Sequence, residues 1–299
     1  MVVVFHDESL RNPNSIDNRE TLQIVETARM YGCYTYFLPA AIGYSIAAVD
    51  ALANLPYFDR PQIGIWAGFI PSEAKYEAVY RAAAEKNVFL VNDPIQHQTA
   101  LEFDRYYPLL GNLTPQSLTI TSLDECADAG AKLGFPVFVR GAVKSNKTLG
   151  WDACVANDSD ELSYIVEQIL SIPHRARGRA IIRQLVKLRY RSIMPGNFPR
   201  SREYRLFVCR GQVLACGYYW DEFEDEFILT ELDRASLDRL AILAAIQVNV
   251  PYIIVDIGQL ESGDWIVIEI GDAQFAGMSH VSIVELWSKL AIIDELQIK

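Results

Sequence analysis

Short apolar runs alternate with segments of helical spacing through the first ~110 residues, and this alternation limits the fold more than any other feature of the sequence. The runs typical of buried strands are 2–6, 35–38, 63–67 and 88–91. The segments with helical spacing are 20–31, 45–55 and 72–86. Such alternation is typical of an α/β layer. We therefore predict an N-terminal α/β domain over residues 1–115, and no glycine-rich phosphate loop follows any of its strands.

A second pattern begins near residue 118 and combines helices with two hairpins. The tetrapeptide Ser122-Leu123-Asp124-Glu125 has the form of a capping box, and the helix that it opens is expected to end at Gly134. Apolar runs flank the turns at 210–211 and 261–264, which is the pattern of β-hairpins. We predict a second domain over residues 116–299, with a small α+β lobe at about 116–183 and a larger antiparallel lobe at about 184–299.

The composition excludes several classes of protein. The chain has 27 basic and 38 acidic side chains, and its net charge of −11 opposes general binding to nucleic acid or anionic membranes. No apolar run reaches the ~18 to 20 residues that cross a bilayer, and the N-terminus lacks the pattern of a signal peptide. The five scattered cysteines suggest reduced thiols in a cytoplasmic protein. The sequence leaves the oligomeric state open, and a homodimer is compatible with it.

Two carboxylates are expected to face each other in the second hairpin. A loop at 261–264 pairs residues whose numbers sum to 525, and Asp256 and Glu269 meet this condition. Facing like charges are destabilising, and oxygen ligands without His or Cys favour Mg²⁺ or Mn²⁺ as the compensating ion. Asp272 follows in the sequence and is a candidate third ligand. The alternative is a solvated hairpin face, which the apolar flanks disfavour. Without metal, removing one carboxylate should hold or raise thermal stability.

Basic side chains gather in one part of this acidic chain. Eight lysines and arginines lie within residues 179–205, and Arg140 precedes a loop that contains Lys144 and Lys147. Guanidinium and ammonium groups beside a divalent cation are what polyphosphate binding requires. For the strand residues Arg140, Arg183 and Arg205 we favour an anion site. For the arginines at 189, 191, 200 and 202, solvated loop charges are an equally good interpretation.

These elements resemble the ATP-grasp superfamily in their order and spacing. The motifs are Phe138-Val139-Arg140, Ile181–Val186, Arg202–Val208, Val255-Asp256-Ile257 and Ile268–Asp272. The resemblance is greatest to the bacterial and phage branch that has Arg in place of the strand-end Lys. It spans about residues 118–277, and the first ~110 residues stand in the place of the usual preceding α/β domain. The implied fold is a two-lobed ATP-grasp domain with ATP between its lobes.

The resemblance implies a set of ATP contacts. Arg140 matches the strand-end cation that contacts the α- and β-phosphates, while Lys144 and Lys147 fall in the phosphate loop, here without its usual glycines. Glu203 matches the acid that binds the ribose hydroxyls. The residues that match the adenine-binding hinge strand are Arg183, Gln184, Leu185 and Val186. A first hairpin in which paired numbers sum to 421 would place Glu203 and Arg205 on the face of Cys216 and Tyr218.

The resemblance also implies the chemistry. Arg205 matches the cation near the transferred phosphate and is, with Arg140, a candidate catalytic residue. Asp256 and Glu269 match the magnesium ligands, and Asp272 is a candidate third ligand because Gly271 replaces the usual Asn. The implied activity is ADP-forming ligation of a carboxylate to an amine through an acylphosphate, on small amino acids or peptides. The alternatives are an ATP-dependent kinase acting on a small molecule and a non-catalytic ATP-binding module.

Overall fold

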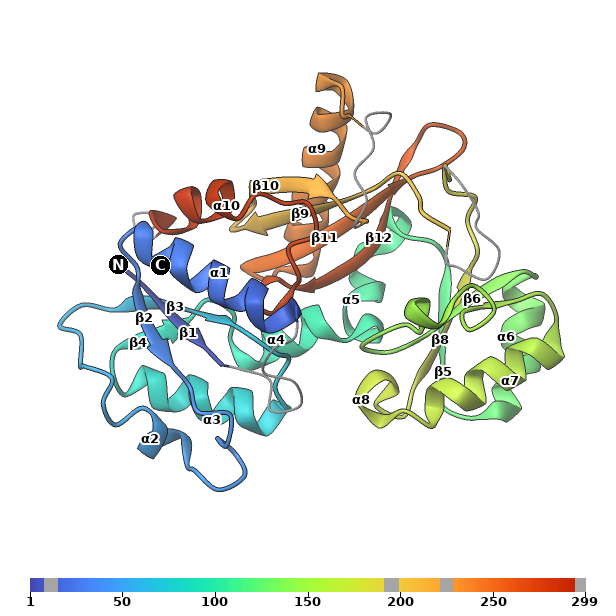
Figure 1. Ribbon diagram of the computed structural model, residues 1–299. Helices are drawn as coiled ribbons and strands as arrows, with labels where there is room; N and C mark the ends of the chain where they lie inside the picture. Colours follow the sequence, from blue (N-terminus) through green and yellow to red (C-terminus); the bar gives the residue numbers. More distant parts are fainter. Residues whose placement is uncertain (8–15, 191–198, 221–227, 294–299) are drawn as a thin grey trace.

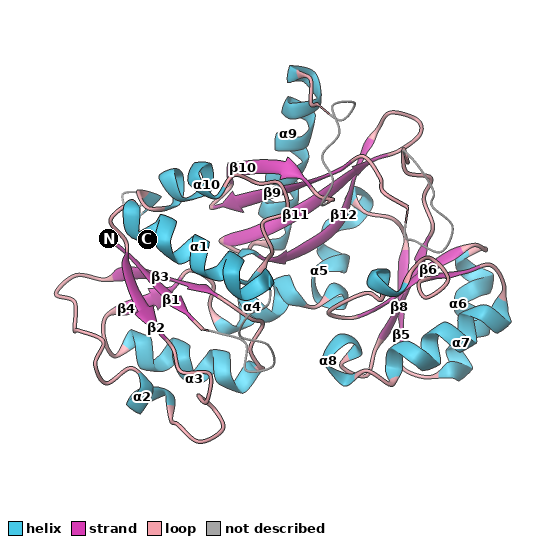
Figure 2. Ribbon diagram, viewed as in Figure 1, coloured by secondary structure: helices cyan, strands magenta, loops and turns pink. Residues whose placement is uncertain are grey.

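The computed structural model describes residues 1–7, 16–190, 199–220 and 228–293, and it contains three four-stranded sheets (Figure 1). In this view the N-terminal sheet lies at the lower left, the second sheet at the lower right, and the third sheet above them. Figure 2 shows helices packed around each sheet. This mixed α/β architecture confirms the predicted fold class. No helix within the described ranges is both long and apolar enough to span a membrane.

The N-terminal sheet is parallel, in the strand order β2–β1–β3–β4. Its strands are β1 (Val2–His6), β2 (Tyr34–Phe37), β3 (Gln62–Ala67) and β4 (Val88–Leu90). The helices of this region are α1 (Ile16–Met30), α2 (Ala48–Ala51), α3 (Glu73–Ala84), α4 (Pro94–Leu101) and α5 (Phe103–Leu110). The carboxyl ends of β1 and β3 meet at the point where the strand order reverses, which is where open α/β sheets bind ligands.

Helix starts in this layer follow local side-chain chemistry. The Ser72 side chain accepts a hydrogen bond from the Lys75 backbone N–H, so α3 begins where the sequence predicts. The Asp93 side chain and Gln96 form a capping box with a proline at the first turn of α4. Helices α4 and α5 were not predicted from the sequence, and α2, with four residues, is shorter than the predicted helix at 45–55.

The second sheet is antiparallel, in the order β5–β8–β6–β7. Its strands are β5 (Ser117–Ile120), β6 (Val137–Gly141), β7 (Val155–Ala156) and β8 (Ala180–Gln184). Its helices are α6 (Cys126–Leu133), α7 (Ser159–Leu170) and α8 (Pro173–Ala176). The predicted capping box between Ser122 and Glu125 is confirmed, and it opens a short 3₁₀ turn that runs into α6.

The third sheet is antiparallel, in the order β10–β9–β11–β12, and both of its faces are covered. Its strands are β9 (Glu203–Cys209), β10 (Gln212–Tyr218), β11 (Tyr252–Gln259) and β12 (Trp265–Asp272). Helices α5 and α9 (Glu231–Val248) cover one face. The N-terminal sheet, α1 and α10 (Ile283–Leu290) cover the other face. Every residue of β11 is therefore buried, which excludes a solvated hairpin.

Two β-bulges decide which side chains share a face in this sheet. The predicted pairing of Asp256 with Glu269 is confirmed, although the register shifts by one residue just beyond it, toward the loop. In the first hairpin the register shifts between Val213 and Ala215. Beyond that bulge Arg205 pairs with Gly217 rather than Cys216, so the predicted face with Cys216 and Tyr218 is wrong.

Candidate nucleotide-binding site

A pocket between the second and third sheets brings together most of the residues predicted to contact ATP. Its polar wall contains Arg140, Lys147, Arg183, Glu203 and Glu269. The segment 184–186 also lines it, together with apolar side chains such as Phe138, Leu188 and Ile268. An apolar slot with charged groups along one side fits a flat base attached to a polyanion.

Glu203 supplies an unused hydrogen-bond acceptor to this pocket. Its side chain is 1% exposed, and one carboxylate oxygen accepts a hydrogen bond from the Ser201 hydroxyl at 2.9 Å. The other oxygen, Oε1, has no hydrogen-bond partner among the described residues. Burial raises the pKa of Glu203, against the opposing effect of Lys147. Because a buried acceptor without a donor is costly, this oxygen is suited to a ligand hydroxyl.

Asp256 is bound on both oxygens by one arginine. Arg205 donates from Nε to Oδ1 and from Nη2 to Oδ2, each at 2.8 Å, and the Asp256 side chain is almost fully buried. The third guanidinium nitrogen of Arg205, Nη1, donates to the carbonyl oxygen of Gly277 at 2.7 Å. Bidentate pairing fixes the guanidinium plane, so Arg205 has one orientation in the site.

Glu269 pairs with a different arginine. Arg140 donates from Nη2 to Glu269 Oε1 at 2.8 Å and also binds the carbonyl oxygens of Gly141 and Val143. Burial acts to raise the pKa of Glu269, but Arg140 and Lys147 outweigh it and the pKa is lowered. The Glu269 side chain keeps 27% of its surface exposed. It therefore presents an ionised carboxylate to the pocket.

These two ion pairs correct the sequence-based account of the facing carboxylates. Each negative charge already has its own arginine, so a metal ion is not needed to offset repulsion between Asp256 and Glu269. The expectation that removing one carboxylate would hold or raise stability is no longer supported, because removal would leave a buried arginine unpaired. The sequence-based prediction overlooked these partners because they lie on other strands. Arg140 comes from β6 of the second sheet and Arg205 from β9 of the third sheet.

The donor set at this position still fits a hard divalent cation. Asp256 and Glu269 supply carboxylate oxygens only, and each oxygen that pairs with an arginine retains a second lone pair. No cluster of three metal-binding side chains occurs in the part of the chain that the structure describes. An ion held here would therefore take further ligands from phosphate oxygens and water, as Mg²⁺ commonly does.

The structure does not bring Asp272 to this pair. Successive side chains of a strand alternate between faces, so Asp272 points away from the face that carries Glu269. Its carboxylate instead contacts His97 Nδ1 at 2.7 Å and accepts hydrogen bonds from Asn92 and Gln274. Its side chain has no exposed surface. These contacts argue against Asp272 as a third metal ligand.

Tyr219 is a site residue that the sequence analysis missed. Its ring lies 5.4 Å from Lys147 Nζ and 5.0 Å from the Arg205 guanidinium carbon. The bulge in β10 puts Tyr219 opposite Glu203. The backbone N–H of Tyr219 donates a hydrogen bond to the carbonyl oxygen of Glu203. Burial acts to lower the pKa of Lys147. The combined effect of Tyr219, Glu203 and the carboxylates of Asp256 and Glu269 is larger and raises the pKa. Lys147 is therefore a cation at neutral pH.

The remaining predicted cations have different environments. Buried Arg183 donates to Thr114 Oγ1 at 2.6 Å and to two backbone carbonyls of β12, and burial lowers its pKa to about 10. These hydrogen bonds tie the second sheet to β12, and Arg183 also lines the nucleotide pocket. Arg202 is engaged by Asp233 and Gln259. Arg191 lies outside the described residues.

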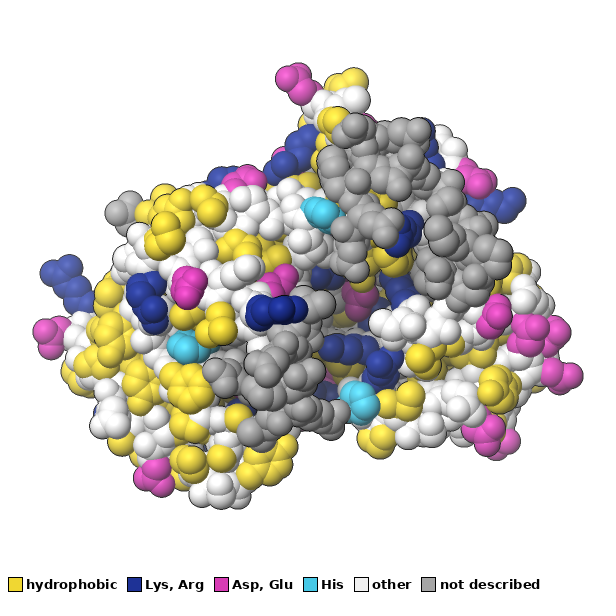
Figure 3. All heavy atoms as spheres, viewed as in Figure 1, with side chains coloured by type: hydrophobic (Ala, Val, Ile, Leu, Met, Phe, Trp, Pro, Cys, Tyr) yellow, Lys and Arg dark blue, Asp and Glu magenta, His cyan; other side chains and the backbone are white. Residues whose placement is uncertain are grey.

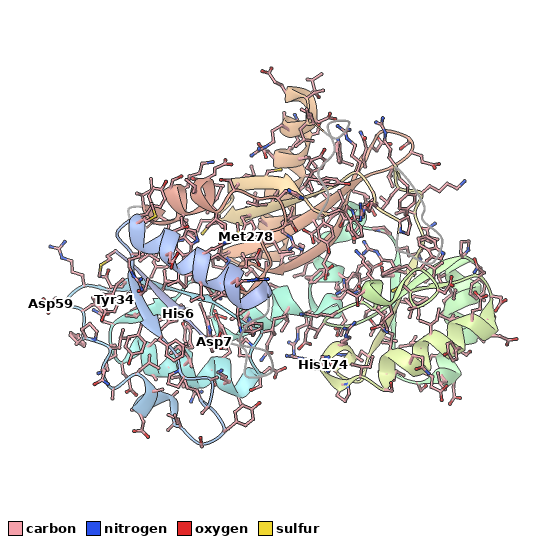
Figure 4. All side chains as sticks on the ribbon, in the orientation of Figure 1. His6, Asp7, Tyr34, Asp59, His174 and Met278 are labelled. Carbon is pink, nitrogen blue, oxygen red and sulfur yellow. The ribbon has the colours of Figure 1, made fainter. Side chains whose placement is uncertain are left out.

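Lys144 lies outside the nucleotide pocket, on the wall of a groove that follows the carboxyl edge of the N-terminal sheet. The groove consists of two pockets that share Phe69, Ile70 and Lys144. Figure 3 shows basic side chains gathered in the hollow between the N-terminal layer and the second sheet. In Figure 4, Asp7 at the end of β1 and His174 on α8 lie on opposite sides of this groove.

Comparison with known proteins gives one family. Residues 131–290, more than half of the chain, match the model of an ATP-grasp domain, R₂K clade family 3. The chain therefore belongs to this clade of ATP-grasp domains, which confirms the predicted superfamily. No curated protein sequence matches it.

Solved structures resemble the whole chain at low sequence identity. D-cycloserine synthetase DcsG has a TM-score of 0.64 and 14% identity, covering 99% of this chain and 100% of its own. D-alanine–D-alanine ligase from Bacillus anthracis, complexed with ATP, has a TM-score of 0.63 and 13% identity, covering 91% and 85%. ATP-grasp ligase PsnB with minimal precursor, Mg and ADP has a TM-score of 0.57 and 13% identity, covering 91% and 88%. These similarities show the shared fold.

Proposed function

We propose that this protein is an ATP-dependent, ADP-forming ligase that joins a carboxylate to an amine through an acylphosphate. The observation that carries the proposal is the pair of arginine–carboxylate contacts, Arg140–Glu269 and Arg205–Asp256. Arg140 and Glu269 line the nucleotide pocket together with apolar side chains. Membership of the ATP-grasp superfamily and the fold shared with D-alanine–D-alanine ligase, DcsG and PsnB support it.

In this proposal the base of ATP lies against the segment 184–186, and the free oxygen of Glu203 accepts hydrogen bonds from the ribose hydroxyls. Arg140 and Lys147 then face the polyphosphate from the second sheet. Their charges offset those of the phosphates, and Arg140 is held for this role by two backbone carbonyls. Little side-chain movement is needed, because burial and ion pairs already fix these groups.

Asp256 and Glu269 would hold Mg²⁺ in the same proposal. A bound Mg²⁺ withdraws charge from the phosphate oxygens and orients them for transfer. The solved PsnB complex contains Mg and ADP, which supports the choice of metal for this fold. The role of this chain's residues is to present the two carboxylates at a fixed spacing, which the ion pairs with Arg205 and Arg140 accomplish.

The chemical steps follow from this arrangement. A carboxylate oxygen of the acid attacks the γ-phosphorus, the bond to the β–γ bridging oxygen breaks, and ADP leaves. The amine nitrogen then attacks the acyl carbon, inorganic phosphate leaves, and the amine loses its proton to solvent. In this proposal Arg205 offsets the charge that develops on the transferred phosphoryl group. The protein therefore contributes positioning and charge rather than a nucleophile of its own.

The acid substrate is proposed to occupy the part of the groove next to Arg205. That pocket is lined by Phe207, two residues along β9 from Arg205, and by Gly277, whose carbonyl oxygen binds Arg205. Lys144 stands beside it with no partner among the described side chains. The groove has both charged and apolar walls and suits amino acids or peptides, the substrate class that we propose.

The test is a screen for ADP and phosphate release with Mg-ATP and pairs of amino acids or short peptides. The proposal predicts release that needs both an acid and an amine, and a product one water lighter than their sum. Release with one hydroxyl compound and a stable phosphorylated product would instead indicate a kinase. Tight Mg-ATP binding without turnover of any pair would favour a non-catalytic module.

A further inference from the structure

Asp272 belongs to a fully buried polar network between the third sheet and the N-terminal layer. Its Oδ2 atom lies 2.7 Å from His97 Nδ1 on α4, and its Oδ1 atom accepts a hydrogen bond from Asn92 Nδ2 at 2.9 Å. Asn92 also exchanges two hydrogen bonds with the backbone of Tyr252 on β11. The exposed fractions of the His97 and Asp272 side chains are 1% and 0%. This network joins the two layers through the Asp272 carboxylate and the Asn92 side-chain amide.

The turn that follows Asp272 is fixed by the same layer. Asp272 caps the 3₁₀ turn η5 (Ala273–Phe275) by accepting a hydrogen bond from the Gln274 backbone N–H at 3.0 Å. The Gln274 side chain accepts from the backbone N–H of Trp66 and donates to the Tyr76 hydroxyl. Further along, the backbone N–H of Met278 donates to Glu20 on α1 at 2.9 Å. The 272–278 turn is thus held at both ends by the N-terminal layer.

An aromatic stack makes this anchor rigid. The ring of His97 stacks on Tyr76 with centroids 4.0 Å apart, and Tyr76 stacks on Trp66 at 5.9 Å. Phe275, from the turn itself, packs edge-on against His97 at 5.2 Å. Close packing of this kind leaves the turn few alternative positions, because a buried aromatic ring moves only if its neighbours move.

The 272–278 turn also contacts Arg205. The carbonyl oxygen of Gly277 accepts a hydrogen bond from Arg205 Nη1 at 2.7 Å. Among the described hydrogen bonds, the Arg205 guanidinium otherwise binds only Asp256. Residues 273–278 also form a wall of the pocket in which we place the acid substrate. One short segment therefore contacts both Arg205 and the acid pocket.

We propose that Asp272 and His97 are positioning residues for phosphoryl transfer: the buried His97–Asp272 contact fixes the 272–278 turn, and the Gly277 carbonyl passes that constraint to Arg205. This inference rests on the proposed ligase function. It gives Asp272 a role other than that of metal ligand, and it makes the N-terminal layer part of the reaction site. A small displacement of Arg205 is costly, since misplacement by ~1 Å can reduce a rate by roughly a hundredfold.

Three variants separate positioning from stability. His97→Ala removes the donor to Asp272. His97→Asn restores it, because the amide nitrogen of Asn is as many bonds from Cα as Nδ1 is in His. Leu52→Ala is the matched control, since Leu52 is fully buried in the core of the N-terminal layer but has no hydrogen bond to the turn.

The first measurement is amide hydrogen exchange of the metal-free protein, which needs no substrate. His97→Ala should speed exchange at Gln274 and Met278 by roughly ten- to a hundredfold, the range expected from loss of one hydrogen bond to a charged group. His97→Asn should return exchange toward the wild-type rate, and Leu52→Ala should leave it unchanged. Equal exchange in all four proteins would overturn the inference.

The second measurement is steady-state ADP release with Mg-ATP and an active acid–amine pair. His97→Ala should lower kcat by roughly tenfold or more while KM for ATP stays near the wild-type value. His97→Asn should recover most of kcat. A fall in kcat that Leu52→Ala reproduces would mean general destabilisation and would contradict a positioning role.

A magnesium titration of Asp272→Asn distinguishes positioning from metal binding. The positioning role predicts lower kcat at an unchanged Mg²⁺ requirement, whereas a ligand role predicts a requirement raised severalfold and activity recovered at high Mg²⁺. If the proposed ligase function is wrong, the wild type itself will release no ADP with any acid–amine pair. The hydrogen-exchange measurement would still test the His97–Asp272 contact in that case.

Discussion

Arg205 donates hydrogen bonds to both carboxylate oxygens of Asp256 across the β9–β11 ladder. Its remaining guanidinium nitrogen, Nη1, donates to the Gly277 carbonyl oxygen. Asp256 in turn faces Glu269 across the β11–β12 ladder, and Arg140 from another lobe binds Glu269. Four charges from the four strands β6, β9, β11 and β12 therefore alternate in sign beside the nucleotide pocket. This arrangement holds two carboxylates close together beside two guanidinium groups, which suits a polyphosphate site with Mg²⁺.

Asp256→Asn should destabilise the metal-free protein by about 3 kcal/mol or more, because a buried ion pair broken on one side leaves an unpaired charge. Thermal or urea unfolding in the presence of a chelator measures this. Glu269→Gln should cost less, since the Glu269 side chain is 27% exposed and Arg140 keeps two backbone acceptors. An Asp256→Asn protein as stable as the wild type would show that repulsion between the carboxylates dominates after all.

Glu203→Gln should stabilise the nucleotide-free protein at neutral pH. Burial raises the folded-state pKa of Glu203 above its ordinary value of 4.5, so the folded state holds the proton more tightly than the unfolded state. The ionised side chain therefore costs stability as pH rises from 4.5 through the folded-state pKa, and Gln avoids this cost. The difference in unfolding temperature should shrink as pH falls toward 4.5 and vanish below it. A difference that grows on acidification would contradict the account.

The same variant should weaken nucleotide binding. Gln keeps an acceptor but loses the charge that strengthens hydrogen bonds to ribose, a loss of roughly ten- to a hundredfold in affinity. Calorimetry with Mg-ATP measures this, and Mg-2′,3′-dideoxy-ATP, which has no ribose hydroxyls, serves as the control ligand. Wild type and Glu203→Gln should bind the control ligand alike. Equal losses with both ligands would place Glu203 away from the ribose.

Lys144 and Lys147, three residues apart, should behave differently. Lys147 lines the nucleotide pocket, whereas Lys144 lines only the groove. Lys147→Ala should therefore raise the dissociation constant for Mg-ATP by roughly ten- to a hundredfold. Lys144→Ala should leave that constant unchanged and raise only KM for the acid substrate. Identical effects of the two variants on ATP affinity would contradict the division between pocket and groove.

Arg140→Lys should recover little of what Arg140→Ala loses. Arg140 binds Glu269 and two carbonyl oxygens with three separate N–H directions, and an ammonium group cannot reproduce this planar fan of donors. We expect both variants to reduce ADP release by roughly tenfold or more. A lysine variant with wild-type activity would mean that charge alone matters at this position.

Sequence patterns predicted the Asp256–Glu269 pairing because strand periodicity and loop length determine register. Asp256 and Glu269 lie in two long apolar runs joined by a short loop, so their pairing follows from counting. The motifs around Arg140 and Glu203 had the order and spacing of the family. The proposed domain boundary near residue 115 and the individual ATP and metal contacts stay predictions.

Other features depend on contacts between distant segments and could not be read from local patterns. The bulge near Leu214 changes which residues share a face with Arg205, and it puts Tyr219 in the site instead of Cys216. Asp272 looks like a metal ligand from its spacing, yet His97 lies 175 residues away in sequence. The arginines that pair with Asp256 and Glu269 likewise come from the strands β9 and β6, and no single sequence motif contains both partners of a pair.

The most direct test of the proposed ligase follows oxygen from the acid into phosphate. With a substrate pair from the screen, the acid is labelled with ¹⁸O in its carboxylate, and the released inorganic phosphate is analysed by mass spectrometry. An acylphosphate pathway predicts one ¹⁸O atom in each phosphate, with ADP and phosphate formed in equal amounts. Phosphate without label, or AMP with pyrophosphate in place of ADP, would contradict the account.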